Sequence, residues 1–335
     1  MRPDMTKRER VEATLCGHET DRPPWSLWRH FYDRETTVEG LAESMLWFQS
    51  RYQFDFLKVN PRAQYHVEDW GVRYRYSSDP HQKPQLVEAP VHQPSDWTRI
   101  GPLRPDQGAL GEHLRALRLI KQGLKGEVPF IQTIFNPLSI AGDLVATDTD
   151  LVNDLRQNPR LVKHALEVIT ETFVRFALAC LDVGVDGIFF ATTTLATRAT
   201  LTPAEYEEFG RPYDLRVLSA IADAPFNVLH VCQDDSLVLE LADYPVRALS
   251  WAATSPSNPS LGGVLRNIAD KAVIGGLSQD ALTADDPNQA VEEVVRARDE
   301  TERRRWMLGP NCSIPTRSRD QVIKAVGREI GIQLP

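Results

Sequence analysis

Short apolar runs alternate with longer amphipathic stretches along this chain. Most of the runs are almost continuously apolar, which is typical of parallel strands buried on both faces. Eight such runs cover residues 24–31, 54–60, 130–137, 184–194, 226–234, 248–255, 272–279 and 305–314. The helical patterns between them cover residues 159–182, 203–223, 236–243, 260–269, 287–304 and 318–330. This alternation predicts an α/β protein folded as a (β/α)8 barrel, a TIM barrel.

The longest interval between two runs separates the second from the third. We predict one barrel domain over residues 1–335, with residues 61–128 inserted on its rim. The inserted segment contains a hairpin pattern, GVRYRYSS, and a loop that we predict to be solvated, with a lid as the alternative; that loop carries Tyr65, His66, Glu68 and Asp69. The alternative fold, an open doubly wound sheet, favours a glycine-rich turn after the first strand. The first run continues instead into HFYDRE, which has no glycine.

Charge and composition exclude several classes of protein. The 335 residues include 38 Lys and Arg against 46 Asp and Glu, a formal net charge of −8. This balance argues against a nucleic-acid binder that neutralises phosphates. No apolar run approaches the ~20 residues that span a bilayer, and the opening MRPDMTKRERVEATL lacks the apolar core of a signal peptide. We therefore expect a cytoplasmic protein that binds neither nucleic acid nor membrane.

The four cysteines are too few for a disulfide scaffold in so long a chain. His230 and Cys232 are two residues apart on one predicted strand, so their side chains point to the same face. Cys312 lies near the carboxyl end of the last run, where a barrel gathers its strand ends. Imidazole and two thiolates favour Zn²⁺, and three protein ligands leave an open position, as in catalytic zinc sites. The alternative is that Cys232 and Cys312 are ordinary core cysteines, as we expect Cys16 and Cys180 to be.

Polar residues at the other strand ends are further candidates, because barrel enzymes place catalytic groups there. We predict catalytic roles for Arg29, which would bind a carboxylate or phosphate, and for Asp234, as acid, base or partner of His230. The alternatives are a rim salt bridge for Arg29 and a helix cap for Asp234. The predicted substrate-binding residues are Asn60, Asn136, Trp251 and Gln279. Turn caps are the alternative for both asparagines, and packing on the strand layer is the alternative for Trp251.

Several segments resemble the uroporphyrinogen decarboxylase superfamily through most of the chain. They are TKRERVEATLCGHETDRPPW, FDFLKVNPRAQYHVEDWG, FNPLSIAGDL, GVDGIFFATTT, NVLHVCQDD and LGPNCSIPTRS. The resemblance implies a single (β/α)8 barrel with a deep cleft at the carboxyl ends of its strands. It also implies a small-molecule substrate and leaves a homodimer open.

The decarboxylase branch of that superfamily carries two arginines four residues apart on its first strand. Arg29 matches the first arginine, but Asp33 stands at the second position. A carboxylate there would repel a substrate that bears carboxylates. The branch also carries an Asp after the second strand, where this chain reads Asn60-Pro61-Arg62. A decarboxylase-like lyase that acts on a carboxylated substrate is therefore the alternative function.

The other branch comprises zinc-dependent, corrinoid-linked methyltransferases with a His-x-Cys motif and a distant Cys. His230, Cys232 and Cys312 match this motif, whereas Gln233 replaces the usual glycine after the first Cys. The resemblance implies methyl transfer between a cobamide and a thiol or similar acceptor, with Zn²⁺ as cofactor and methylcobalamin or another cobamide as co-substrate. The chain has no Asp-x-His-x-x-Gly corrinoid motif, so we expect the cobamide on a corrinoid protein or free. A non-catalytic corrinoid- or tetrapyrrole-binding protein is the alternative from another class.

Overall fold

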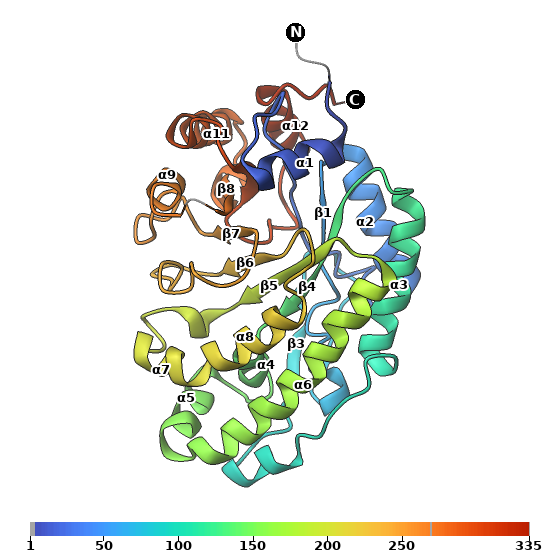
Figure 1. Cartoon of the computed structure of the whole chain (residues 1–335). Helices are drawn as coiled ribbons and strands as arrows, with labels where there is room; N and C mark the ends of the chain where they lie inside the picture. Colours follow the sequence, from blue (N-terminus) through green and yellow to red (C-terminus); the bar gives the residue numbers. More distant parts are fainter. Residues whose placement is uncertain (1–3, 269, 335) are drawn as a thin grey trace.

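The computed structural model describes residues 4–268 and 270–334. Within these residues, parallel strands form one seven-stranded sheet in the order β1-β4-β5-β6-β7-β8-β9 (Figure 1). The strands are β1 (Leu57–Val59), β4 (Phe130–Phe135), β5 (Gly187–Thr192), β6 (Val228–Val231), β7 (Ala248–Trp251), β8 (Ala272–Leu277) and β9 (Trp306–Pro310). Each predicted run after the first contains one of these strands, and the sheet curls as the barrel prediction requires.

The first predicted run closes the barrel without forming a regular strand. It lies between β9 and the start of β1, with a single parallel bridge between Trp25 and Leu308. The Leu308 amide donates to the Pro24 carbonyl over 2.8 Å, and the Asp55 amide donates to the Trp25 carbonyl over 2.9 Å. Pro23 and Pro24 have no amide hydrogen to donate, which limits the ladder in this segment. The predicted barrel is therefore confirmed, and one of its eight extended segments is not a regular strand.

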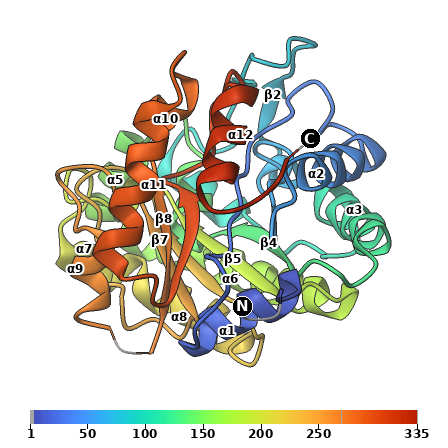
Figure 2. The same ribbon diagram turned by 90° about the horizontal axis from the view of Figure 1, so that it is seen from above.

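Helices cover the outside of the sheet (Figure 2). They are α1 (Lys7–Cys16), α2 (Val38–Tyr52), α3 (Gly108–Leu124), α4 (Pro137–Gly142), α5 (Asp148–Gln157), α6 (Pro159–Val183), α7 (Pro203–Phe209), α8 (Arg211–Ala220), α9 (Leu261–Leu265), α10 (Gln279–Thr283), α11 (Asn288–Thr301) and α12 (Asp320–Glu329). The helix predicted over 203–223 is divided at Gly210 into α7 and α8. The helix predicted over 236–243 is wrong, because those residues form a bridge and turns. The helix predicted over 260–269 is shortened to α9, and its last residue lies outside the described residues.

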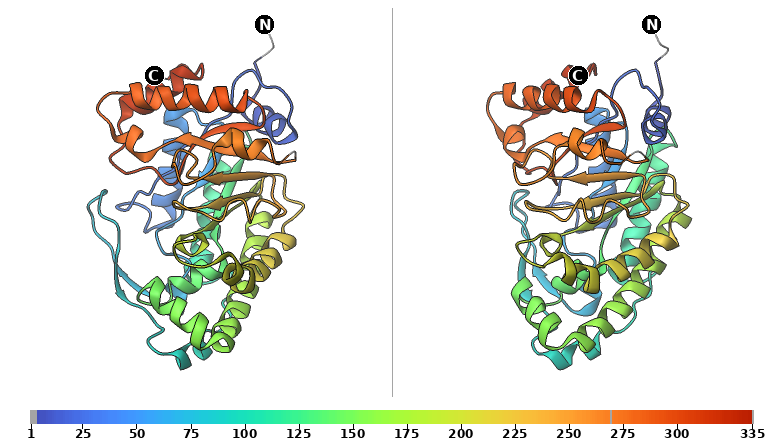
Figure 3. Two further views of the ribbon diagram at one scale, coloured as in Figure 1. Left: turned by 90° about the vertical axis from the view of Figure 1, so that its left-hand side faces the viewer. Right: turned by 60° about the vertical axis from the view of Figure 1, so that its left-hand side comes forward.

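The segment 61–128 contributes both rim structure and a barrel helix. It holds the short 3-10 helices η1 (Glu68–Trp70) and η2 (Pro94–Arg99), with the antiparallel pair β2 (Arg73–Arg75) and β3 (Gln85–Glu88) between them. The light-blue chain that carries this hairpin runs along the outer edge of the molecule in both views of Figure 3. Its last part, α3, packs against α2 and α6. The rim structure thus precedes α3, and α3 occupies an ordinary barrel position.

Alternation along the strands separates the barrel interior from the helix-facing layer. Val228 belongs to an inner cluster with Trp28, Phe56 and Phe189, whereas Leu229 and Val231 belong to the layer under the helices. Because side chains alternate along a strand, His230 faces the interior with Val228. None of the described helices has the length and apolarity needed to cross a membrane.

Candidate metal centre and substrate pocket

His230, Cys232 and Cys312 meet at the carboxyl ends of β6 and β9. Their ligand atoms all lie within 4.8 Å of one another. The two sulfurs are 3.4 Å apart, which is a thiol contact and far longer than the ~2.05 Å of a disulfide. His230 is buried, and both cysteines are half-buried. The structure therefore brings together the three residues that the motif predicts as ligands.

The His230 ring is held by the neighbouring strand. Its Nδ1 lies 3.1 Å from Ser250 Oγ, and Ser250 is the residue paired with His230 in the register of β6 and β7. The ring also stacks on Phe189, with ring centroids 5.1 Å apart. Among the described residues, buried His230 Nε2 has no hydrogen-bond partner. The Nε2 atom is therefore free to serve as a metal ligand while Nδ1 sets the ring orientation.

The contact between the two cysteines shifts their pKa values in opposite directions. The hydrogen bond from the Cys232 thiol lowers the pKa of Cys312 well below its usual value, and the nearby His230 and Lys58 act in the same direction. Donating that hydrogen bond, together with burial, raises the pKa of Cys232. Ionisation is therefore favoured at Cys312 over Cys232. Binding of a divalent metal, which takes thiolate ligands, would release protons from the pair.

Lys58 is a buried cation in the same pocket, and the sequence predictions missed it. Its Nζ lies 2.5 Å from Asn60 Oδ1 and 4.9 Å from the centroid of the Phe189 ring. Burial lowers the pKa of Lys58 to about 7. The available signal was a lysine inside the apolar run FDFLKVN, two residues before Asn60 and so on the same strand face.

The pocket around these residues is small, with a cavity volume of about 320 Å³. This volume is near the lower end of the usual range for ligand sites. The walls carry Trp28, Lys58, Asn60, Thr133, Phe135, Asp143, Asp148, Phe189, Thr192, His230, Cys232 and Cys312, among others. Buried Asn60 Nδ2 also lacks a partner in the described part of the chain. The predicted substrate-binding role of Asn60 is thus consistent with its position.

A buried histidine supports the opposite wall of this pocket. His66 Nε2 lies 2.7 Å from Asp143 Oδ2, and only the Asp143 side chain is partly exposed. Tyr65, next to it, is buried and donates to the Thr133 carbonyl. The prediction of a solvated loop is therefore wrong for Tyr65 and His66, because they pack under the rim.

Two predicted catalytic residues lie away from this pocket. Arg29 donates to the Thr316 carbonyl over 2.9 Å, and its guanidinium covers the Phe31 ring at 4.4 Å. Asp234 is exposed. The hydrogen-bond partner of His230, a role predicted for Asp234, is Ser250. Neither residue is among those that line the pocket. Arg29 faces away from the interior because its neighbour Trp28 belongs to the inner cluster, and Asp234 lies in the exposed turn after β6.

Three predicted substrate-binding residues also lie outside the pocket lining. Asn136 caps α4, accepting from the Ser139 amide, and donates to Tyr206 and Asp214. Trp251 faces the helices because its neighbour Ser250 faces the interior, and its indole donates to the Pro259 carbonyl. Gln279 is the first residue of α10. The capping alternative for Asn136 and the packing alternative for Trp251 describe what the structure shows.

This chain is similar to known proteins over most of its length. The family model for uroporphyrinogen decarboxylase matches residues 6–330. A uroporphyrinogen decarboxylase of Nocardia farcinica is 29% identical over 150 residues, which are 43% of this chain and 41% of that protein. The methylcobamide:CoM methyltransferase MtbA of Methanosarcina mazei is 22% identical over 227 residues, 66% of this chain and 65% of MtbA. The chain thus spans less than two thirds of these relatives.

Solved structures agree on the fold. A methyltransferase from Methanosarcina mazei superimposes with a TM-score of 0.83 at 19% identity, covering 97% of this chain and 98% of that one. A B12-independent methionine synthase from Shewanella superimposes with a TM-score of 0.61 at 12% identity, covering 92% and 94%. Identities this low show the shared barrel and nothing finer. Because the family model matches nearly the whole chain, this protein belongs to the uroporphyrinogen decarboxylase family.

Proposed function

We propose that this protein is a zinc-dependent methyltransferase that moves a methyl group between a cobamide and a thiol or similar acceptor. The observation that carries the proposal is the convergence, at the carboxyl ends of barrel strands, of two sulfurs and an imidazole nitrogen that has no hydrogen-bond partner among the described residues. The similarity to relatives named methylcobamide:CoM methyltransferase supports the same branch.

The donor set fits zinc on chemical grounds. A buried imidazole nitrogen without a partner is costly unless a ligand satisfies it. Thiolates and imidazole are the ligands that zinc prefers, and three of them leave the fourth position to an acceptor. When bound, zinc supplies a Lewis acid that keeps an acceptor thiol as its thiolate at neutral pH. A cytoplasmic, reducing compartment would keep both cysteines available as ligands.

The remaining pocket residues would position the acceptor. Lys58 and the free amide nitrogen of Asn60 present donors on one wall, and Asp143 presents an acceptor on another. Trp28 and Phe189, whose ring centroids lie 5.3 Å apart, form an apolar part of the wall, and electrostatic contacts are stronger beside apolar walls than in water. The small cavity suits a compact acceptor, whereas a cobamide would approach from the barrel mouth, carried by a corrinoid protein or free.

The two alternatives rest on less of the structure. The decarboxylase hypothesis relies on Arg29 to bind a substrate carboxylate, but this guanidinium is engaged by the Thr316 carbonyl and the Phe31 ring. A non-catalytic corrinoid-binding protein would have no need of an unpaired imidazole beside two thiol groups. A homodimer stays a prediction.

The proposal is tested by metal content and turnover together. We expect one zinc per chain in the purified protein and its loss, by at least 90% (about a tenfold fall in occupancy), in Cys232→Ser and Cys312→Ser. Cys16→Ser, which changes an exposed cysteine, is the matched control and should keep its zinc. Methylcobalamin demethylation is assayed with a panel of thiols including homocysteine, and with tetrahydrofolate as the non-thiol acceptor. Full zinc in the Cys232→Ser and Cys312→Ser proteins, or turnover without zinc, would contradict the proposal.

A further inference from the structure

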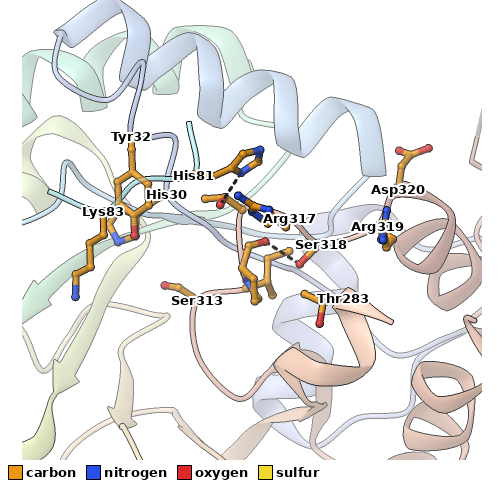
Figure 4. A pocket seen from close by; sticks show the side chains of 13 residues that line it. His30, Tyr32, His81, Lys83, Thr283, Ser313, Arg317, Ser318, Arg319 and Asp320 are labelled. Carbon is orange, nitrogen blue, oxygen red and sulfur yellow. Dashed lines mark hydrogen bonds between the residues drawn. The ribbon is translucent and has the colours of Figure 1, made fainter. Parts of the chain in front are cut away.

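A second cavity opens next to the metal pocket, with a volume of about 920 Å³ (Figure 4). We call it the outer cleft. It lies between the β2–β3 hairpin, the segment after the first extended run, and the loop after β9. His30, Lys83 and Ser313 line both cavities, so the outer cleft continues into the metal pocket. A ligand bound here can extend to the metal centre.

The charges around the outer cleft leave a positive surplus. Arg319 pairs with Asp285 at 2.7 Å, Asp320 pairs with Arg51 at 2.8 Å, and these charges offset one another. Lys83 and Arg317, both exposed, have no ion-pair partner among the residues that the structure describes. Both cations line the same cleft, so their charges act on the same volume. They would attract an anion to this part of the surface.

The walls of the outer cleft are held in place by hydrogen bonds. His81 Nδ1 contacts Thr316 Oγ1 at 2.9 Å, which links the hairpin to the loop after β9. The Ile314 amide donates to the Trp28 carbonyl, and Ser318 Oγ donates to the Pro315 carbonyl. Arg29 adds its bond to the Thr316 carbonyl on the far side of the same loop. A cleft whose loops are already fixed loses less entropy when a ligand binds.

We propose that the outer cleft binds the anionic phosphodiester of a cobamide's nucleotide arm, through Lys83 and Arg317. The inference rests on the proposed function, because it takes the methyl donor to be a cobamide. The size of the cleft suits an arm made of a base, a ribose and a phosphate better than the metal pocket does. Arginine and lysine are the usual side chains that bind phosphate oxygens.

The test compares methylcobalamin with methylcobinamide, which lacks the nucleotide arm and its phosphate. Equilibrium dialysis with the zinc-loaded protein, read by corrin absorbance, should show methylcobalamin bound about tenfold more tightly. Lys83→Gln and Arg317→Gln should each weaken methylcobalamin binding about three- to tenfold and leave methylcobinamide binding unchanged. Raising the salt concentration should reduce the preference, because these cations are exposed.

The matched control is Arg304→Gln, which removes the same charge just before β9, at the opposite end of the barrel. It should leave both affinities unchanged within twofold (an order-of-magnitude limit for an exposed charge). Equal affinity for the two corrinoids, or an equal loss for both in the Lys83 and Arg317 variants, would overturn the inference. Such a result would leave the zinc content and thiol methylation from methylcobinamide intact, so it is distinguishable from failure of the proposed function.

Discussion

Two of the buried polar clusters in the described residues, around Asp214 and around His230, differ in how completely their atoms are paired. Around Asp214, one carboxylate oxygen accepts from Asn136 and the other from Tyr206 and Tyr244, at 2.8–3.0 Å. Around His230, an imidazole nitrogen and the Asn60 amide nitrogen have no partner within residues 4–268 and 270–334. A buried network with its bonds complete contributes to stability, whereas unpaired buried atoms cost free energy unless a ligand satisfies them. The comparison separates a structural cluster from a candidate binding site.

The largest expected effect breaks the paired cluster. Asp214→Ala would leave the buried donors of Asn136, Tyr206 and Tyr244 without their acceptor, so we expect the free energy of unfolding to fall by about 3 kcal/mol. Urea unfolding followed by circular dichroism measures this loss. Tyr244→Phe removes one donor only and should cost about 1 kcal/mol. If Asp214→Ala lowered the free energy of unfolding by less than about 1 kcal/mol, the cluster would contribute little to stability.

The next effect depends on pH. Burial raises the pKa of Asp214 to about 6 from its usual 3.8, so the folded protein binds this proton more tightly than the unfolded chain does. The stability from this protonation is complete below pH about 4 and is lost as the pH rises through about 6. Relative to Asp214→Asn, the wild-type protein should therefore lose about 2 to 3 kcal/mol between those pH values. The free energies of unfolding of both proteins, measured in urea from pH 4 to 7, give the difference.

The Asn variant keeps the shape of the side chain and cannot ionise, so it isolates the titration from the packing. A difference between the two proteins that does not change with pH would show that the Asp214 carboxyl titrates alike in the folded and unfolded states. In that case the two clusters would differ in pairing alone and not in their response to pH.

The smallest effect concerns the residue that orients the candidate ligand. Ser250→Ala removes the partner of His230 Nδ1, and we expect zinc affinity to fall about tenfold, with stability changed by less than about 1 kcal/mol. Competition with a chromogenic chelator measures the affinity. Ser26→Ala is the matched control, because Ser26 Oγ is buried and has no hydrogen-bond partner among the described residues. Equal affinities for the two variants would exclude an orienting role for Ser250.

Much of this architecture follows from local pattern. The continuous apolar runs predicted each strand after the first, and the two-residue spacing of His230 and Cys232 placed both side chains on one face. The first run was predicted as a regular strand and is only an extended segment with one bridge; Pro24, at its start, lacks an amide hydrogen. The predicted helix over 236–243 failed because its residues form turns against the neighbouring loop, where Asn258 accepts from the Ser236 amide.

The other strand-end predictions show the limit of that reasoning. Asn60 and Asn136 both follow a strand and precede a proline, yet one lines the pocket and the other caps a helix. Trp251 and Ser250 are neighbours on β7, and only the register with β6 turns Ser250 toward His230. The lysine in the apolar run FDFLKVN indicated that Lys58 shares a strand face with Asn60, but only the pairing of β1 with β4 decides that this face is the barrel interior.

The sequence alone thus determines the order of strands and helices, because strand periodicity and burial follow from residue order. It also determines that His230 and Cys232 share a strand face and that Cys312 lies near a later strand end. Register and loop packing decide the rest. They determine which strand ends line the pocket, which of its atoms lack partners among the described residues, and that Lys83 and Arg317 line the same cleft. Those contacts join residues far apart in the chain, and each is settled only when the barrel closes and the rim hairpin meets the loop after β9.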